Sequence, residues 1–167
     1  MFDEGKKIII YLAGPLFTQA ERIWNIQLHD ALISLDSGLS IYMPQREVEK
    51  AYDGNVLNFD KVFEICRDGI DECDAMVAIL EGSDADSGTC WECGYAYARG
   101  KPIIGVRTDA RASEDEGFNP MLRRSCVEIV VSNAIKEDRD PKLKDRPDIK
   151  IKSLAESIYN LVKKVLE

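Results

Sequence analysis

Histidine is almost absent from this sequence, since His29 is the single example among 167 residues. A zinc site, or a catalytic pair of serine or cysteine with histidine, depends on imidazole groups. His29 stands near polar Gln27 and Asp30 in a helix-like stretch, which indicates a surface position. We therefore expect no metal site, and catalysis would have to use carboxylates, hydroxyls or thiols.

Positive charge is also scarce. The 22 Lys and Arg residues are outnumbered by 30 Asp and Glu residues, which gives a formal net charge of -8 at pH 7. Binding to a nucleic-acid backbone or to an anionic membrane requires a clustered positive surface. We expect neither partner, and a small, neutral or weakly charged ligand fits the composition better.

Long apolar runs are missing as well, because no segment approaches the roughly 20 apolar residues of a spanning helix. Residues 1–7 hold no apolar stretch preceded by positive charge, so no secretory leader is expected. The cysteines are odd in number, and a chain of this length does not need disulfides. We expect reduced thiols and a cytoplasmic protein. The five cysteines are Cys66, Cys73, Cys90, Cys93 and Cys126.

Apolar segments rich in β-branched residues alternate with segments of helical periodicity, which predicts a single α/β domain over residues 1–167. The predicted strands are residues 7–13, 39–43, 75–80, 102–106 and 127–131, and the predicted helices are residues 18–35, 58–73, 89–99 and 153–166. This alternation favours a parallel sheet between two helical layers. We predict a flavodoxin-like three-layer sandwich with strand order 2-1-3-4-5, and surface loops at residues 108–118 and at the charged segment 136–148.

Ligands of such a sheet bind beyond the carboxyl ends of the strands, at the switch point between strands 1 and 3. The loops that follow Ala13 and Leu80 should therefore meet at the site. The first of these begins with Gly14-Pro15 and is too poor in glycine for a dinucleotide fingerprint or a P-loop. We expect no nicotinamide cofactor and no ATP.

Residues 86–96 (DSGTCWECGYA) join the predicted third strand to a helix and carry the most information. Thr89 and Glu92 have the spacing of a capping box, which is a purely structural interpretation. Glu92 is nevertheless preceded by a second carboxylate, Asp86, and is expected in the first helical turn, where the helix dipole favours an ionised carboxylate at neutral pH. An ionised carboxylate beside another that can share a proton is the pair that retaining glycosyl transfer needs.

Two further patterns have simpler interpretations. Ser153 and Glu156 have the spacing of a capping box for the last helix. Cys90 and Cys93 could form a redox pair at a helix N-terminus, where the pKa of a thiol is lowered. The usual Gly-Pro between such cysteines is replaced by Trp-Glu, and buried cysteine often serves as a small apolar residue.

Four motifs follow one another in residues 7–131, and together they resemble the nucleoside 2-deoxyribosyltransferase family. They are residues 11–17 (YLAGPLF), 69–75 (GIDECDA), 86–96 (DSGTCWECGYA) and 119–121 (NPM). That family has a flavodoxin-like fold and exchanges one nucleobase for another on 2'-deoxyribose, with no metal or organic cofactor. The resemblance implies that the partners of this chain are 2'-deoxynucleosides and free nucleobases.

The resemblance also implies roles for individual residues. Glu92 would attack C1' of the sugar as the nucleophile, and Tyr11 would orient its carboxylate. Asp86 would pass a proton to or from the base. Substrate contacts are implied for Gly14, Phe17, Gln45, Gly88, Asn119 and Met121. The last two match a segment that family members lend to the neighbouring subunit, which implies a homo-oligomer with shared sites.

The sequence departs from the family pattern in two places. Several members carry a site-facing aspartate where this chain has Cys66, and Asp68 is the candidate to replace it. Some members place their terminal carboxylate near the site, whereas this chain ends in a predicted helix. Base specificity drawn from that tail cannot be carried over.

Three other functions remain open alongside base exchange. A related hydrolase would use water as the acceptor, and such relatives hold a 5'-phosphate in a loop with glycine and arginine after strand 1. Here that loop is largely apolar (residues 14–18, GPLFT), which favours an unphosphorylated sugar. The remaining alternatives are a thiol-redox protein using Cys90 and Cys93, and a binding or sensing domain that has the fold without turnover.

Overall fold

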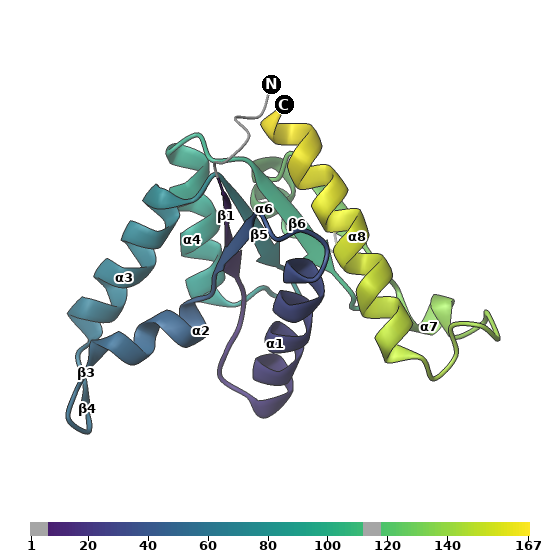
Figure 1. The fold of residues 1–167 in the computed structure, drawn as a ribbon, viewed down its shortest axis with the longest axis horizontal. Coiled ribbons are helices and arrows are strands. Elements are labelled where there is room, and N and C mark those ends of the chain that lie inside the picture. Colours follow the sequence, from purple (N-terminus) through teal and green to yellow (C-terminus); the bar gives the residue numbers. More distant parts are fainter. Residues whose placement is uncertain (1–6, 112–117) are drawn as a thin grey trace.

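The computed structural model describes residues 7–111 and 118–167, in which strands and helices alternate as predicted (Figure 1). The first half contains β1 (Ile8–Ala13), α1 (Gln19–Ile33), β2 (Leu39–Tyr42), α2 (Pro44–Glu47), the 3-10 helix η1 (Val48–Ala51), β3 (Tyr52–Asp53), β4 (Val56–Leu57) and α3 (Phe59–Glu72). The second half contains β5 (Ala75–Ile79), α4 (Ser87–Ala98), β6 (Ile103–Arg107), α6 (Pro120–Ser125), β7 (Glu128–Val131), α7 (Ala134–Glu137) and α8 (Pro147–Leu166).

Five parallel strands form the central sheet in the order β2-β1-β5-β6-β7. This is the predicted order 2-1-3-4-5, because β3 and β4 pair only with each other in a separate antiparallel hairpin. Tyr11 of β1 is in register with Tyr42 of β2 and with Met76 of β5. The switch point between β1 and β5 is therefore where the order of the strands predicts a ligand site.

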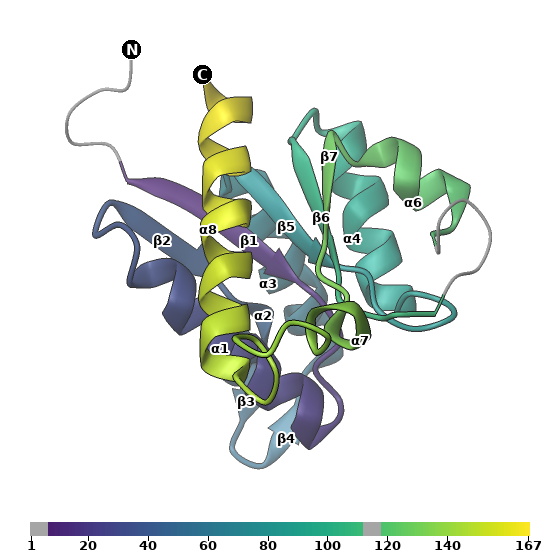
Figure 2. The same ribbon diagram turned by 90° about the vertical axis from the view of Figure 1, so that its right-hand side faces the viewer.

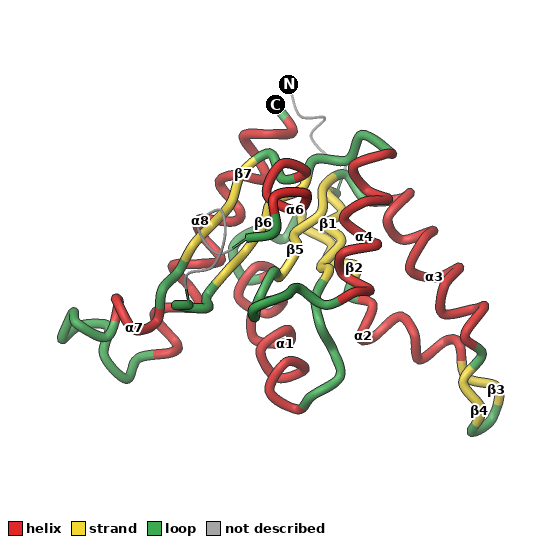
Figure 3. Tube along the Cα trace, turned by 180° about the vertical axis from the view of Figure 1, so that it is seen from behind, coloured by secondary structure: helices red, strands yellow, loops and turns green. Residues whose placement is uncertain are grey.

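Helices cover both faces of the sheet, and each face buries its own apolar cluster (Figure 2). On one face, Leu28 and Leu32 of α1 and Ile158 of α8 pack on the strands. On the other face, Ile70 of α3 and Cys93 of α4 pack on the strands, and α3, α4 and α6 are seen over this face in Figure 3. Burial of apolar surface on both faces is what stabilises a parallel sheet of this kind.

The last helix differs from the prediction. It begins at Pro147, so Ser153 lies inside it and the predicted capping box of Ser153 and Glu156 is wrong. Proline favours the first turn of a helix because its fixed φ suits that position and its missing N–H would have no partner there. The connection before α8 is therefore shorter than the predicted loop 136–148, whose first residues belong to α7.

The predicted loop between the second strand and residue 58 also contains structure, namely α2, η1 and the β3–β4 hairpin. These pieces are too short to show a periodic pattern in the sequence. His29 is only partly exposed, with a 2.8 Å contact between its Nδ1 and Asp30. Residues 1–6, and residues 112–117 of the predicted loop 108–118, lie outside the described residues. Across the ranges that the structure covers, no helix is long and apolar enough to span a bilayer.

Candidate active site

A short hydrogen bond joins β1 to α4 at the predicted site. The hydroxyl of Tyr11 donates to Oε1 of Glu92 over 2.6 Å. Tyr11 is fully buried, and its ring stacks on that of Tyr42 with centroids 5.4 Å apart. Burial, followed by the charge of Glu92, raises the pKa of Tyr11, so the phenol keeps its proton and remains a donor.

The pKa of Glu92 differs from what the sequence predicted. Burial is the largest influence on its carboxyl and, together with the charge of Asp86, raises its pKa from 4.5 to about 7, although the bond from Tyr11 acts in the opposite direction. Glu92 is therefore partly protonated at neutral pH, where the sequence analysis expected the ionised form. Because α4 begins at Ser87, Glu92 lies beyond the first turn, where the field of the helix end has weakened.

Asp86 is the N-cap of α4. Its Oδ2 accepts hydrogen bonds from the backbone N–H of Thr89 over 2.9 Å and from the Thr89 hydroxyl over 3.1 Å. The predicted capping box of Thr89 and Glu92 is thus wrong, since Thr89 donates to the cap and does not serve as one. A side chain at Gly88 would bring a Cβ within 3.1 Å of the same oxygen, which explains the small residue there.

The loop after β1 approaches β5 closely. A Cβ on Gly14 would lie 3.0 Å from the side chain of Ile79, so this position requires a residue without one. Phe17 follows with 75% of its surface exposed. The backbone N–H groups of Phe17 and Thr18 both donate to Oε2 of Glu21, which forms a capping box at the start of α1. The carboxylate of Glu21 therefore lies close to the start of α1.

A cavity of about 630 Å³ lies at the carboxyl edge of the sheet. Its size suits a small organic ligand. Phe17 and Asp86 were predicted from the sequence as site residues, and Pro15 lies in the motif of residues 11–17, whereas the other lining residues belong to no motif. Tyr11 and Glu92 are not among the lining residues. The lining residues are Pro15, Phe17, Ala20, Glu21, Trp24, Asn25, Ile79, Glu81, Gly82, Asp84, Asp86, Thr108, Asp109 and Arg111.

Gln45 is buried, and its side-chain amide forms hydrogen bonds within the protein. Its Oε1 accepts from the Asn25 side chain, and its Nε2 donates to the Arg22 carbonyl, each over 3.2 Å. Asn25 also donates to the carbonyl of Pro15 over 2.9 Å. These bonds connect α1, α2 and the loop after β1, so Gln45 contributes to the shape of that loop.

Cys66 lies next to the Tyr11–Glu92 pair. Burial, followed by the charge of Glu92, raises the pKa of its thiol, while a hydrogen bond with Tyr11 lowers it. Asp68 is exposed and pairs with Arg67, with oxygen-to-nitrogen distances of 2.9 and 2.7 Å. The structure thus brings Cys66, and not Asp68, to the pair.

Asn119 and Met121 lie at the start of α6 and are not among the residues that line the 630 Å³ cavity. Oδ1 of Asn119 accepts from the backbone N–H of Met121 over 2.9 Å, and Met121 is 81% exposed. Both line a second cavity of about 560 Å³ between α4 and α6, which also includes Cys90 and Tyr97. Within one chain, these two residues therefore face outward.

The two cysteines of α4 lack the property that redox pairs share. Burial raises the pKa of both thiols, which keeps the proton on sulfur, whereas a redox pair needs a lowered pKa. In the part of the chain that is described, no three His, Cys, Asp or Glu side chains are arranged to hold a metal ion.

The sequence model of one family, described as Nucleoside 2-deoxyribosyltransferase, matches residues 10–133. This match covers well over half of the chain. The chain belongs to the nucleoside 2-deoxyribosyltransferase family. Within this family member, the matched segment includes Tyr11, Asp86 and Glu92, and α8 lies outside it.

The chain is similar to several other proteins. A conserved protein from Enterococcus faecalis V583 has a TM-score of 0.64 and 28% identity, with 84% of this chain and 99% of that one covered. A 2-desoxiribosyltransferase from Leishmania mexicana has a TM-score of 0.52 and 26% identity, with 69% and 85% covered. An uncharacterised protein of Schizosaccharomyces pombe is 35% identical over an alignment of 111 residues, and the alignment covers 61% of this chain. The family member described here spans about half the length of that curated relative, 51% of it being matched.

Proposed function

We propose that this chain transfers the 2-deoxyribosyl group from one nucleobase to another through a covalent bond to Glu92. The observation that carries the proposal is the 2.6 Å hydrogen bond from the Tyr11 hydroxyl to Oε1 of Glu92. This bond fixes Oε1 of Glu92, and in the proposed reaction the other carboxylate oxygen attacks the sugar. Membership of the family supports the same assignment.

In the proposed reaction, the free oxygen of Glu92 attacks C1' while the bond from C1' to the base nitrogen breaks. The electron pair of that bond stays with the base, which takes a proton from Asp86. A second base then attacks C1' from the opposite face and returns its proton to Asp86, so the product keeps the original anomeric configuration. No cofactor enters these steps, and the partners are 2'-deoxynucleosides and free bases.

The transition state of this reaction has oxocarbenium character, and an adjacent carboxylate stabilises its positive charge. Only the ionised form of Glu92 can attack or stabilise. With a pKa of about 7, a substantial fraction of Glu92 is ionised at neutral pH. Burial makes that ionised fraction poorly solvated, which increases its electrostatic effect on the sugar.

The charge of the 630 Å³ cavity favours a nucleoside over a nucleotide. Five carboxylates line it (Glu21, Glu81, Asp84, Asp86 and Asp109), against one guanidinium, that of Arg111. Arg111 is already paired with Asp109, and the carboxylate of Glu21 lies at the N-terminus of α1. A 5'-phosphate would therefore be repelled here.

The exposed positions of Asn119 and Met121 favour a homo-oligomer in which these residues complete a neighbouring subunit's site. They lie at the start of α6, on a surface that one chain leaves uncovered. A cytoplasmic location, which the sequence predicts, would give such an enzyme access to its substrates. The shared site and the cytoplasmic location are both part of the proposed function.

Hydrolysis of the same bond is the second candidate, since water could take the place of the second base. The test is to incubate the protein with thymidine, with and without adenine, beside Glu92→Ala. Transfer predicts deoxyadenosine that depends on adenine and is lost in the variant. Thymine released at the same rate with or without adenine would make the chain a hydrolase, and faster turnover of thymidine 5'-phosphate would contradict the preference for nucleosides.

A further inference from the structure

Asn25 of α1 is a buried amide that lines the 630 Å³ cavity, and only 5% of its surface is exposed. Its Nδ2 donates to the carbonyl of Pro15 over 2.9 Å and to Oε1 of Gln45 over 3.2 Å. A main-chain carbonyl can only accept, so the bond to Pro15 decides which end of the Asn25 amide carries the nitrogen. The Nδ2 end of Asn25 therefore faces these two acceptors.

Gln45 fixes the same arrangement from the other side. Its Nε2 donates to the carbonyl of Arg22 over 3.2 Å, which leaves Oε1 as the end that accepts from Asn25. The resemblance to the family implied a substrate contact for Gln45, but Gln45 is not among the residues that line the cavity. Its bonds instead orient the side chain of Asn25, which does line it.

The oxygen of the Asn25 amide is left for a ligand. No described residue donates to Oδ1 of Asn25. Every fully buried side-chain oxygen or nitrogen of the described residues has a hydrogen-bond partner, so Oδ1 is not fully buried and solvent reaches it. Asn25 borders the 630 Å³ cavity, which is the opening to Oδ1. A fixed acceptor in such a position favours a ligand that places a donor opposite it.

Two aromatic side chains line the same cavity. Phe17 is exposed, and Trp24, directly before Asn25 in α1, is half-buried. Aromatic side chains stack on nucleobases of every kind, because every base has a flat π face. Asp86, which gives a proton to the base in the proposed reaction, also lines this cavity. The cavity thus combines aromatic surface, a proton donor and a fixed acceptor.

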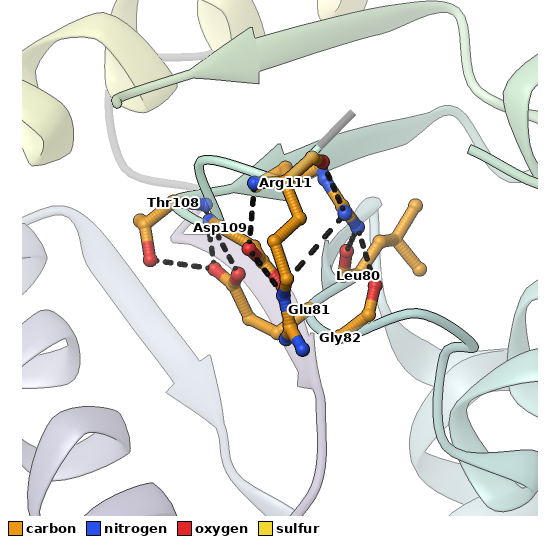
Figure 4. Close-up of polar contacts among 7 residues, drawn as sticks. Leu80, Glu81, Gly82, Thr108, Asp109 and Arg111 are labelled. Atoms are coloured by element: carbon orange, nitrogen blue, oxygen red, sulfur yellow. Dashed lines mark hydrogen bonds and ion pairs between the residues drawn. The ribbon is translucent and has the colours of Figure 1, made fainter. Parts of the chain in front are cut away.

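The loops after β5 and β6 add acceptors to the cavity, while their donors are used within the protein. Glu81 accepts from the Thr108 backbone N–H over 2.6 Å and from the Asp109 backbone N–H over 2.8 Å (Figure 4). Nε of Arg111 donates to both carboxylate oxygens of Asp109. An oxo group on a base would be disfavoured beside these carboxylates, whereas an amino group would be favoured.

We propose that Oδ1 of Asn25 recognises an exocyclic amino group of the base, so that the chain prefers bases with an amino group at C6 of a purine or C4 of a pyrimidine, as in adenine and cytosine. The amino group donates to Oδ1, and the ring lies against Phe17 and Trp24. Asn25 selects the base and takes no part in breaking or forming bonds. The inference rests on the proposed function, because it names the bases used in that reaction.

The test compares 2'-deoxyadenosine with purine 2'-deoxyriboside, which has hydrogen in place of the 6-amino group. Titration calorimetry measures the binding of both to Glu92→Gln, in which the proposed transfer cannot occur, with and without Asn25→Leu. Gln27→Leu is the matched control, because Gln27 is an exposed amide of the same helix. The ratio of kcat/KM for the two nucleosides is measured in the same variants with Glu92 intact.

Glu92→Gln should bind deoxyadenosine about three- to tenfold more tightly than purine deoxyriboside, which is the factor that one neutral hydrogen bond contributes. Adding Asn25→Leu should bring the two Kd values within about twofold of each other, and the ratio of kcat/KM should change by the same factor. Gln27→Leu should leave both ratios unchanged. A general disturbance of the loop after β1 would weaken both nucleosides alike and cancel in the ratio. Asn25→Ala replaces Asn25→Leu if the latter cannot be purified.

Equal binding of the two nucleosides by Glu92→Gln, or binding of neither, would overturn the proposal. So would an Asn25 variant that keeps the preference for deoxyadenosine, because another group would then recognise the amino group. Absence of base exchange in the wild type would instead contradict the proposed function, while the binding comparison would still decide the role of Asn25.

Discussion

Glu92 combines two properties that oppose each other, burial and the need to ionise. Burial raises its pKa to about 7, and Tyr11 partly counteracts this by donating a hydrogen bond to the charged form. The identity of Tyr11, Asp86 and Glu92 as a group was predictable from sequence motifs. The protonation of Glu92 was not, because it depends on how deeply α4 packs on the sheet, which no local pattern contains.

The first prediction concerns the pH dependence of the reaction. Because the proposed reaction needs ionised Glu92 together with a proton on Asp86, kcat/KM should have a bell-shaped dependence on pH, and the midpoint that belongs to Glu92 should lie near 7. Tyr11→Phe removes the bond that lowers the pKa of Glu92, so its midpoint should move to higher pH and its maximal rate should drop. Tyr52→Phe, at an exposed tyrosine of the β3–β4 hairpin, is the control. A midpoint unmoved by Tyr11→Phe in rate measurements across pH would contradict this account.

The second prediction concerns stability. A folded-state pKa raised from 4.5 to about 7 means that ionising buried Glu92 destabilises the fold as the pH rises through this window, by up to about 3 kcal/mol. Below about pH 4.5 the carboxyl is protonated in both states and the effect is absent. Glu92→Gln, which can still accept from Tyr11, should therefore be more stable than the wild type at about pH 8 and nearly equal to it at about pH 4. Urea unfolding at both values checks this, and an equal difference at both would refute it.

At the scale of elements, the strands and the starts of α1 and α3 were predictable, whereas the starts of α4 and α8 were not. Runs of β-branched residues such as Ile8 to Ile10 mark buried strands clearly. The capping-box spacing at Thr89 and Glu92 suggested a helix start three residues too late, since Asp86 has the stronger position for an N-cap. Spacing alone does not reveal which of two candidate caps the backbone uses.

The third prediction separates the cap of α4 from the proton transfer. At about pH 5.5, Asp86→Asn should leave the free energy of unfolding within about 0.5 kcal/mol of the wild type, because asparagine caps helices as well as aspartate does. Asp86→Ala should lose about 1 kcal/mol. Both should lose most base exchange. Thermal unfolding and the exchange assay measure the two effects, and full exchange activity in Asp86→Asn would remove Asp86 from the proposed mechanism.

At the scale of the whole molecule, the parallel sheet and its strand order followed from the alternation of strands and helices. The hydrogen bonds between the loop after β5 and the loop after β6 did not follow from it, because they join residues 80–82 to residues 107–109 through side chains in non-repeating loops. The same holds for the outward position of Asn119 and Met121. Contacts between loops have no periodic signal, so they become visible only in the folded chain.

The fourth prediction concerns α8, which lies outside the segment matched by the family but covers one face of the sheet. Ile158→Ala should lower the free energy of unfolding by about 2 to 5 kcal/mol, because Ile158 is fully buried among α1 and the strands. Ile135→Ala, at a side chain that is 68% exposed, is the matched control and should change it by less than about 0.5 kcal/mol. Similar losses in both variants, measured by urea unfolding, would mean that α8 does not form part of the core.

The most direct measurement of the central claim is mass spectrometry of the protein quenched in acid during turnover of a 2'-deoxynucleoside. The account predicts a fraction of the chain that is heavier by one 2-deoxyribosyl group, with the added mass on the peptide containing Glu92 and absent from Glu92→Gln. Adding a free base before quenching should discharge it. Rapid turnover with no adduct, or an adduct on another residue, would contradict transfer through Glu92.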